Sequence, residues 1–467
     1  MKPARQTAQR RAVPPPAADA QTGAPPVNGA SLRWLEKLGR LPAGFCGDKL
    51  LPLLVHENTK VRTLAAKNLG KIRDIKFLSP LLKIADEDSS TMTRREAAAA
   101  IGRMRDREAI PALAHLTRDR DPQVVLQALL GLLAFNKKDK TIHAALEKLR
   151  AHPNELIRDV IECERSFYFD TPRSRAHQTE SPDFMKNLVV QGDVLATLKK
   201  TPAESVHLTF TSPPYYNARD YSIYASYAEY LEFLRKVFMQ VHRVTKPGRF
   251  FVLNTSPVIL PRAGRKYSSR RYPIPFDLHA LFAPKDWEFI DDIVWEKPEA
   301  CVKNRNAQFA RHRRPLAYKA NSRTEYLMVY RKKCDRLVDW NIRQYDGRHV
   351  RKSLVGGEYE TSNLWKIAPA YDRGHSAVFP ARLCQRVVQY YSLAEDLVFD
   401  PFGGSGTLGR AAAALGRYFF TTEISPQYIR RIREKFGAHP DLFVPEVRFA
   451  DGAQFAAFAG KYKKAHG

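Results

Sequence analysis

The sequence predicts an all-α solenoid of helical repeats followed by an α/β domain built on a doubly wound sheet. Two observations support this fold, and a third indicates the kind of partner. Matching apolar positions recur about every 32 residues in the first third of the chain. Near the C-terminal end, a buried strand, a glycine-rich turn, an alanine-rich helix and a second strand follow one another. The net charge of +27 points to an anionic partner, most often nucleic acid.

The rest of the composition is that of an ordinary globular protein, with 44% hydrophobic and 27% charged residues. No run reaches the roughly 18 unbroken apolar residues of a membrane span. Residues 1–30 are rich in Pro, Ala and Gly and have no apolar core, so they predict a disordered tail rather than a secretory signal. The 5 cysteines form no C-x-x-C pair, which argues against disulfides and a zinc site and fits a reducing cytoplasm.

Stacked helix pairs are expected over residues 31–165. The segments "NTKVRTLAAKNLGKI", "STMTRREAAAAIGRM" and "DPQVVLQALLGLLAF" align with Leu69, Ile101 and Leu132 at equivalent positions. Each segment continues into a second apolar helix, and small residues on the inner face permit close contact between pairs. The pattern resembles HEAT-type repeats, with a plain helical bundle as the alternative. A solenoid carries no chemistry, so we expect it to contact DNA or a partner protein. Residues 166–184 are predicted to be a linker.

The α/β domain is expected over residues 185–467, and its clearest unit is "DLVFDPFGGSGTLG" with the helix and strand that follow. Residues 397–399 and 418–422 predict two buried strands. Three glycines satisfy the G-x-G-x-x-G pattern: Gly404, Gly406 and Gly409. Glu423 follows about 20 residues later, which on its own suggests a dinucleotide. No second βαβ half follows, however, so the helix N-terminus could equally hold a methionine-derived carboxylate.

A second unusual feature is the corner "TFTSPPYYNARDY" near the middle of the chain. The apolar run before it predicts a strand. Pro213 and Pro214 must end that strand, because proline cannot donate to a sheet ladder. Two aromatic residues follow, Tyr215 and Tyr216. An isolated Ser-Pro-Pro-Tyr segment would be a stiff surface turn.

Taken together, "TSPPY" and the later "DPFGGSGT" resemble the amino-methyltransferases of DNA, which methylate exocyclic nitrogens using S-adenosylmethionine. The order of the two motifs is similar to the beta arrangement of that family. Four further stretches resemble the family in the same order: "LVVQGDVLATL", "DDIVWEKP", "RTEYLMVYRK" and "GHSAVFPARL". The resemblance runs from about residue 188 to about residue 432. It implies a Rossmann-like, S-adenosylmethionine-dependent methyltransferase fold.

By this resemblance, Ser212, Pro213, Pro214 and Tyr215 form the catalytic corner. The exocyclic amine of a nucleobase is a poor nucleophile, because its lone pair is delocalised into the ring. We expect the Ser212 hydroxyl and the carbonyl of Pro213, held in one direction by Pro214, to accept the amine hydrogens. Tyr215 is expected to stack on the base once the base has left the duplex. Tyr216 is expected to be packing.

For the cofactor, Asp400 and Glu423 are expected to end two neighbouring parallel strands, at the edge of the sheet where ligands bind. The resemblance implies that Glu423 takes the ribose hydroxyls and that Asp193 reaches the adenine amine, with Asp451 as the rival acid. Phe379 is expected to cover the adenine, with core packing as its alternative. The other cofactor-binding positions are Thr211, Pro401, Phe402, Gly404, Ser405, Gly406 and Thr407. No metal ligand set is expected.

The segment of about residues 257–374 is expected to recognise the target sequence. In residues 261–352, 22 Lys or Arg stand against 11 Asp or Glu. Basic residues alternate there with aromatic and amide residues, as in "RKYSSRRY" and "KNRNAQFARHRRPLAYK". Lys and Arg are expected to bind phosphates, while Arg, Asn and Gln could read base edges.

The sequence therefore predicts a site-specific DNA methyltransferase, cytoplasmic and nucleoid-associated in a prokaryotic-type cell, that modifies the N4 amine of cytosine in double-stranded DNA. The choice of cytosine depends on Ser212, since family members with Asp at this position usually methylate adenine N6. Adenine N6 is the first alternative, and an RNA substrate or a non-catalytic DNA-binding scaffold are the others. The resemblance also implies a place in restriction–modification. The recognition sequence, a partner nuclease and the oligomeric state do not follow from the sequence.

Overall fold

The computed structural model divides into two compact units, residues 1–170 and 171–467, and each has its own hydrophobic core. The residues that the structure describes are 30–38, 41, 45–135, 139–165, 178–216, 224–260, 264, 266–267, 269–334, 336–370, 379–437 and 446–466. The predicted N-terminal tail lies outside the described residues apart from Ala30, and so does the first part of the predicted linker.

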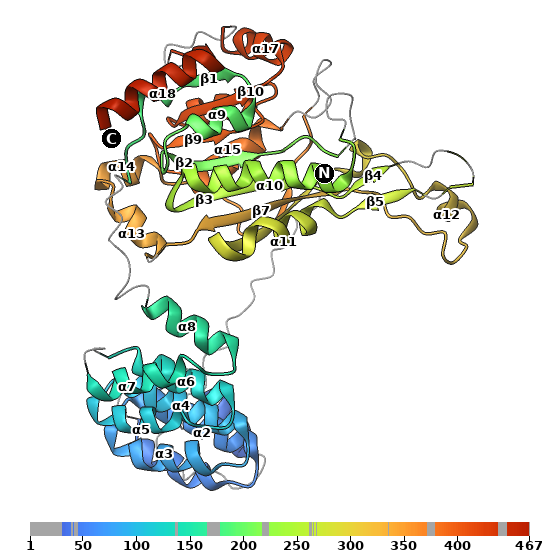
Figure 1. The fold of residues 1–467 in the computed structure, drawn as a ribbon. Helices are drawn as coiled ribbons and strands as arrows, with labels where there is room; N and C mark the ends of the chain where they lie inside the picture. Colours follow the sequence, from blue (N-terminus) through green and yellow to red (C-terminus); the bar gives the residue numbers. More distant parts are fainter. Residues whose placement is uncertain are drawn as a thin grey trace, which may run out of the picture. The chain divides into compact units, whose positions relative to one another are not determined.

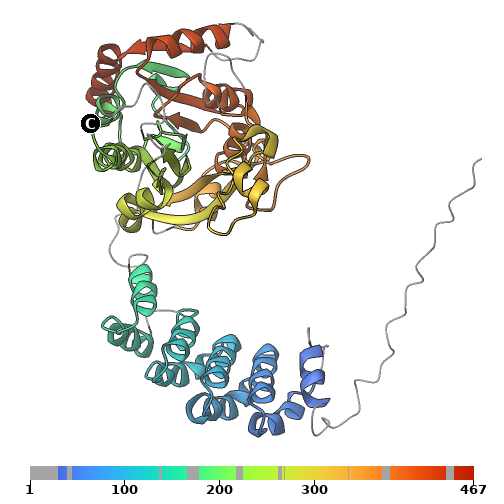
Figure 2. The same cartoon turned by 90° about the vertical axis from the view of Figure 1, so that its right-hand side faces the viewer.

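The first unit is a stack of helix pairs, seen side by side in Figure 2. The helices that contact one another along the first row are α2 (Thr59–Ile72), α4 (Thr91–Met104), α6 (Pro122–Leu132) and α8 (Glu155–Arg165). Their partners are α3 (Leu78–Glu87), α5 (Ile110–Leu116) and α7 (Lys140–Leu149). The remaining elements of this unit are α1 (Ala30–Lys37) and the short 3₁₀ helices η1 (Gly47–Val55), η2 (Ile75–Phe77) and η3 (Arg107–Ala109). The predicted helical solenoid is confirmed.

Small residues let the helices of the first row approach one another closely. A Cβ atom added to Gly70 of α2 would lie 2.6 Å from the Cα atom of Ala100 in α4. A Cβ atom on Gly102 would lie 3.0 Å from the Cα atom of Gly131 in α6. The close contact expected from the small residues of each repeat is therefore present at successive steps of the stack.

Two buried ion pairs join successive repeats. Arg62 Nε lies 2.7 Å from Asp88 Oδ2, and one repeat later Arg94 Nε lies 3.0 Å from Asp119 Oδ2. Because an unpaired charge is costly in a buried position, these pairs favour one register of the stack.

The second unit is built on a nine-stranded sheet of order β11-β1-β10-β9-β2-β3-β7-β6-β8 (Figure 1). Its strands are β1 (Leu188–Gln191), β2 (Val206–Thr211), β3 (Thr245–Thr255), β6 (Trp287–Glu296), β7 (Thr324–Lys332), β8 (Leu364–Lys366), β9 (Leu397–Asp400), β10 (Tyr418–Glu423) and β11 (Arg448–Asp451). In this sheet β7 pairs antiparallel with β3 and β6, and the other neighbouring strands pair in parallel. The late strands β9 and β10 lie between β1 and β2, so the strand order switches at the point where ligands bind in such sheets.

Helices cover both faces of this sheet. One face carries α9 (Val194–Lys200), α10 (Tyr227–Val244), α11 (Ile274–Asp286) and α18 (Gly452–His466), and the other carries α15 (Ala381–Tyr391), α16 (Thr407–Ala414) and α17 (Pro426–Gly437). Alternate residues of β9 enter different cores: Leu397 and Phe399 pack with the first group, and Val398 packs with the second. The predicted doubly wound sheet is confirmed. In the described part of the chain, none of the helices is long and apolar enough to cross a membrane.

The predicted recognition segment does not form one separate body. Its strands β6, β7 and β8 belong to the main sheet. Besides α11, its other elements are the ribbon β4 (Val258–Leu260) and β5 (Arg270–Tyr272), the 3₁₀ helix η6 (Glu299–Cys301), α12 (Ala307–His312), α13 (Val338–Arg343) and α14 (Gly347–Lys352). In Figure 1, β4, β5 and α12 extend beyond one side of the sheet, whereas α13 and α14 lie toward the other side. A further 3₁₀ helix, η5 (Asp183–Met185), precedes β1.

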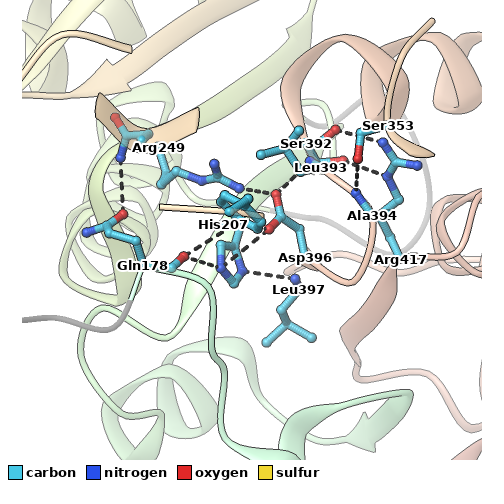
Figure 3. Close-up of polar contacts among 12 residues, drawn as sticks. Gln178, His207, Arg249, Ser353, Ser392, Leu393, Ala394, Asp396, Leu397 and Arg417 are labelled. Atoms are coloured by element: carbon cyan, nitrogen blue, oxygen red, sulfur yellow. Dashed lines mark hydrogen bonds and ion pairs between the residues drawn. The ribbon is translucent and has the colours of Figure 1, made fainter. Parts of the chain in front are cut away.

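A buried polar network at the amino ends of the strands explains where α13 and α14 lie (Figure 3). Asp396, directly before β9, pairs with Arg249 of β3. It also accepts a hydrogen bond from Tyr345, which lies between α13 and α14. His207 of β2 accepts the N–H of Leu397 at Nδ1 (3.0 Å). Burial lowers the pKa of His207 to about 3, so the ring is neutral. This network holds α13 and α14 at the edge opposite the carboxyl ends of the parallel strands.

Candidate active site

Four acidic residues lie at the carboxyl ends of four strands of the parallel half of the sheet. Asp400 is the last residue of β9 and Glu423 the last of β10, one residue beyond each predicted strand. Asp193 follows β1, and Asp451 ends β11. Asp193 and Asp451 are both exposed, and each accepts a backbone N–H of the helix that follows. The structure thus brings the predicted acids to one edge of the sheet. The preference for Asp193 over Asp451 as the acid that reaches the adenine amine stays a prediction.

The glycine-rich turn after β9 passes close to β10. The N–H of Gly403 donates to the carbonyl of Thr422 (2.9 Å), and a Cβ atom on Gly403 would lie 2.8 Å from Thr421 Oγ1. Gly404 and Gly406 have φ angles of +51° and +74°, which side chains with a Cβ atom rarely adopt. The turn therefore requires glycine both for its backbone and for its approach to β10.

The first turn of α16 and the residues around it complete this loop. A Cβ atom on Gly409 would lie 3.0 Å from the ring of Phe419, so this third glycine lets α16 pack against β10. Ser405 Oγ and Thr407 Oγ1 lie 3.2 Å apart at the start of the helix. The carbonyl of Pro401 accepts the hydroxyl of a β10 threonine (2.7 Å). The hydroxyl groups and the helix N-terminus form a polar surface suited to a carboxylate.

Glu423 is tied to the protein backbone through both carboxylate oxygens. Oε2 accepts the N–H of Gly404 (2.8 Å), and Oε1 accepts the N–H of Ser425 (2.8 Å). Burial raises the pKa of Glu423, and these two N–H groups oppose the rise. Each oxygen keeps further lone pairs for a ligand hydroxyl, and the ribose-binding role of Glu423 stays a prediction.

Asp400 joins the end of the catalytic strand to the glycine turn. Its Oδ1 accepts the hydroxyl of Thr211, the last residue of β2 (2.7 Å), and the N–H of Phe402 (3.0 Å). Burial raises the pKa of Asp400 to about 7, against the effect of these two donors. Thr211 and Asp400 are 189 residues apart in sequence. Their hydrogen bond therefore links the two motifs that the sequence analysis combined.

We expect Asp400→Asn to stabilise the protein at alkaline pH. A carboxyl group whose pKa rises from 3.8 to about 7 on folding contributes stability below pH 3.8 that is lost as the pH rises through 7. Asparagine carries no charge and keeps the Oδ1 acceptor for both donors. The free energy of unfolding in urea should rise by about 2–4 kcal/mol at pH 8 and by little at pH 4. A difference of the same size at both pH values would contradict the raised pKa.

The corner that ends β2 remains at the carboxyl edge. Thr211 still pairs with Leu253 of β3, and residues 212–215 then leave the sheet. Pro213 is buried, whereas Ser212, Pro214 and Tyr215 are partly exposed. The structure therefore leaves part of the corner open to a ligand, and its catalytic role stays a prediction.

Tyr215 is anchored by an acid that the sequence reasoning missed. Its hydroxyl donates to Oε2 of Glu325 in β7 (3.0 Å), and the other oxygen of Glu325 pairs with Lys297. Burial and the nearby Glu325 raise the pKa of Tyr215. One feature of the sequence could have drawn attention to Glu325, because it is the only acid in residues 300–334.

Two other aromatic residues have packing contacts. Tyr216 is buried, as its expected packing role requires. Its ring contacts those of Tyr227, Tyr230 and Tyr272. Phe379 stacks on Phe210, with ring centroids 4.7 Å apart and 17° between the ring planes. This contact is the packing that was the alternative for Phe379, and a role in covering adenine stays a prediction.

The connection between β6 and β7, residues 297–323, is called the basic arm below. It contains eight Lys or Arg residues and one acid, Glu299. Because β7 begins beside the end of β3 in antiparallel register, the basic arm leaves the sheet at the edge that carries the catalytic corner. Of the predicted recognition segment, the basic arm and the β4–β5 ribbon are therefore the parts placed to meet a substrate at this edge.

Comparison with known families gives two matches. Residues 206–434 match the family model of DNA methylases. Residues 47–134 and 78–162 match HEAT repeats, in agreement with the resemblance expected from the sequence.

Among curated proteins, the chain is 26% identical over 260 residues to the type II beta methyltransferase M.BslI of Bacillus sp. (strain NEB-606), covering 53% of this chain and 27% of that protein. It is 28% identical over 252 residues to the type II methyltransferase M.ScaI of Streptomyces caespitosus, covering 52% and 78%. It is 27% identical over 255 residues to the DNA adenine methyltransferase YhdJ of Escherichia coli (strain K12), covering 52% and 80%. The chain thus spans only about a quarter of M.BslI.

Among solved structures, TTHA0409 of Thermus thermophilus in complex with S-adenosyl-L-methionine is 25% identical, with a TM-score of 0.45, covering 57% of this chain and 97% of that one. The cytosine-N4-specific PvuII DNA methyltransferase is 19% identical, with a TM-score of 0.41, covering 61% and 94%.

Proposed function

We propose that this chain, whose residues 206–434 belong to the DNA methylase family, transfers the methyl group of S-adenosyl-L-methionine to the N4 amine of cytosine in double-stranded DNA. The observation that carries the proposal is the hydrogen bond between Thr211 and Asp400 (2.7 Å). It holds the Ser-Pro-Pro-Tyr corner directly beside the glycine turn. A base amine at the corner and a cofactor at the turn would then be neighbours, as direct transfer requires.

The carboxyl edge supports the cofactor assignment. S-adenosyl-L-methionine supplies an electrophilic methyl group on a sulfonium when bound. The turn and the start of α16 offer N–H groups and the hydroxyls of Ser405 and Thr407 for its carboxylate end. Glu423 offers fixed acceptors for ribose hydroxyls, and Asp193 lies at the end of the next strand, where it can accept from the adenine amine.

At the corner, the protein's task is to position a weak nucleophile. Ser212 and the carbonyl of Pro213 accept the hydrogens of the exocyclic amine and aim its nitrogen toward the cofactor. Tyr215 stacks on the extruded base, and stacking on an aromatic ring returns about 1–3 kcal/mol of the cost of flipping. Glu325 fixes the tilt of that ring by accepting its hydroxyl.

We expect Glu325→Ala to lower turnover roughly tenfold, because Tyr215 then loses its hydrogen bond to Glu325 and a small misplacement of a catalytic group is costly. Tyr215→Phe removes the same hydrogen bond, so the double variant should be no slower than the slower single variant. Glu299→Ala is the matched control, since Glu299 is an acid of the basic arm, which directly precedes β7, and its side chain is 70% exposed. Additive losses in the double variant would show that Glu325 does not act through Tyr215.

The proposal also specifies the target base. Ser212 favours cytosine N4, because family members with Asp in its place usually methylate adenine N6. Adenine N6 is the second candidate, and the similarity to YhdJ, an adenine methyltransferase, favours it. Sequencing that detects modified bases in DNA from cells expressing the protein would report the base and the site together. N6-methyladenine without N4-methylcytosine would overturn the choice of cytosine.

With DNA as its substrate, we propose that the enzyme acts in the cytoplasm, at the nucleoid. For the HEAT repeats, which carry no residues of the corner or the turn, we propose contact with DNA or with a protein partner.

A further inference from the structure

The basic arm carries a turn with an unusual residue at its centre. The carbonyl of Arg314 accepts the N–H of Ala317 (3.3 Å), so Pro315 and Leu316 are the two central residues of a β-turn. Leu316 has a φ angle of +67°. Proline followed by a residue with positive φ defines a type II turn, in which glycine normally takes the second place because it has no Cβ atom. Leucine is strained here, and retained strain of this kind clusters at functional sites.

Leu316 is also fully exposed. Its relative exposure of 103% is the highest among the large apolar side chains of the described residues. Pro315 stiffens the turn on one side of Leu316. On the other side, the ring of Tyr318 packs edge-on against Phe309 of α12, with centroids 5.3 Å apart. The protein therefore holds an apolar side chain in water on a stiff support, which favours a partner that would bury it.

The charges around Leu316 indicate which partner this is. Residues 303–323 contain seven Lys or Arg residues and no Asp or Glu. Arg313, Arg314 and Lys319 are all exposed close to Leu316. This combination fits a nucleic acid duplex. The Lys and Arg side chains can bind its phosphates, and the apolar side chain can enter between two base pairs. A docking site for a protein would need a larger continuous apolar surface than one leucine.

Side-chain contacts connect the base of the basic arm to the candidate active site. The N–H of Arg305 donates to Asn321 Oδ1 (2.7 Å) and closes the arm near its base. At the arm's end, Arg323 pairs with Glu296, the last residue of β6 (2.8 Å). Two residues further, Glu325 holds the hydroxyl of Tyr215. A single segment of the chain, held by these contacts, therefore connects the turn that carries Leu316 to Glu325. Glu325 in turn holds Tyr215, whose ring is expected to stack on the base.

We propose that Leu316 is a wedge that enters the base stack of DNA at the place vacated by the target base. The inference rests on the proposed function and adds to it the group that keeps the duplex open. Extruding a base costs its pairing and stacking, and an apolar side chain in the gap restores part of the lost contact. The target base then remains at Tyr215 instead of returning to its partner.

The test is Leu316→Gly, which removes the wedge but leaves a residue that adopts a φ of +67° freely, so the turn keeps its shape. Methyl transfer is measured on two versions of one duplex that carries the site found by sequencing. In the first version the target base is paired, and in the second it lies opposite an abasic position. The variant should lose about tenfold in rate on the paired duplex and stay within about twofold of the wild type on the unpaired one.

Leu337→Ala is the matched control, because Leu337 is 76% exposed but precedes α13, away from the basic arm. It should keep the wild-type rate on both duplexes. An equal loss for Leu316→Gly on both duplexes, or no loss on either, would overturn the wedge, while wild-type transfer to DNA would leave the proposed function standing. A wild type that methylates neither duplex would remove the proposed function and the wedge with it.

Discussion

Ser212→Ala and Tyr215→Ala are each expected to lower turnover about 100-fold or more while the cofactor still binds. Ser212→Ala removes an acceptor for the amine hydrogens, and Tyr215→Ala removes the ring on which the base stacks. The hydrogen bonds of Asp400 to Thr211 and Phe402, and those of Glu423 to Gly404 and Ser425, are kept in both variants. The measurement is the rate of methyl transfer to DNA together with the affinity for S-adenosyl-L-methionine by calorimetry.

Tyr216→Phe provides the control for this pair. Tyr216 is the next residue in the chain and is buried among other tyrosine rings, so a phenylalanine keeps its packing. It should keep turnover near that of the wild type. If Ser212→Ala and Tyr215→Ala also kept wild-type turnover, the corner would not be the catalytic site.

The second large effect concerns stability. Asp396→Ala should lower the free energy of unfolding by about 3–5 kcal/mol, because it leaves the buried Arg249 without its carboxylate. The same carboxylate accepts the N–H of Leu393 (Figure 3). It also accepts the Tyr345 hydroxyl, so both hydrogen bonds are lost as well. Thermal unfolding of the whole chain, followed by calorimetry, should show the melting of the second unit shifted to lower temperature and that of the first unit unchanged.

Arg235→Ala is the matched control for this prediction. Arg235 pairs with Glu232 on the surface of α10, and the two side chains are 34% and 44% exposed. Exposed pairs of this kind contribute about 0–1 kcal/mol. A loss for Asp396→Ala no larger than that for Arg235→Ala would show that the buried network does not fasten the amino ends of the strands.

Much of the fold followed from sequence patterns because they report on backbone requirements. Gly404 and Gly406 have positive φ angles, and the prolines of the corner end β2 as their missing N–H groups require. The acids Asp400 and Glu423 lie at the ends of adjacent strands, as the strand–turn–helix–strand order predicted. The same motifs predicted the doubly wound sheet. In the structure, β9 and β10 of this sheet lie between β1 and β2.

Long-range side-chain contacts could not be predicted in this way. The bond from Tyr215 to Glu325 spans 110 residues, and nothing in the local sequence of either residue points to the other. The arrangement of the predicted recognition segment could not be predicted for a related reason, and its role stays a prediction. Its basic charge is spread over elements at two edges of the sheet, and buried contacts such as those of Asp396 and Asn341 hold α13 and α14 at the edge opposite the basic arm. The sequence did not distinguish Leu316 from other apolar residues, because its exposure and its positive φ angle depend on the turn in which it lies.

The most direct test of methyl transfer to DNA is to incubate the protein with double-stranded DNA and with S-adenosyl-L-methionine labelled in its methyl group. The DNA is then digested to nucleosides. The label should be recovered in N4-methylcytosine, and Ser212→Ala should remove it. Label found only in N6-methyladenine would contradict the choice of base. No label in any DNA nucleoside, across DNAs of varied sequence, would contradict the central claim that this protein is a DNA methyltransferase.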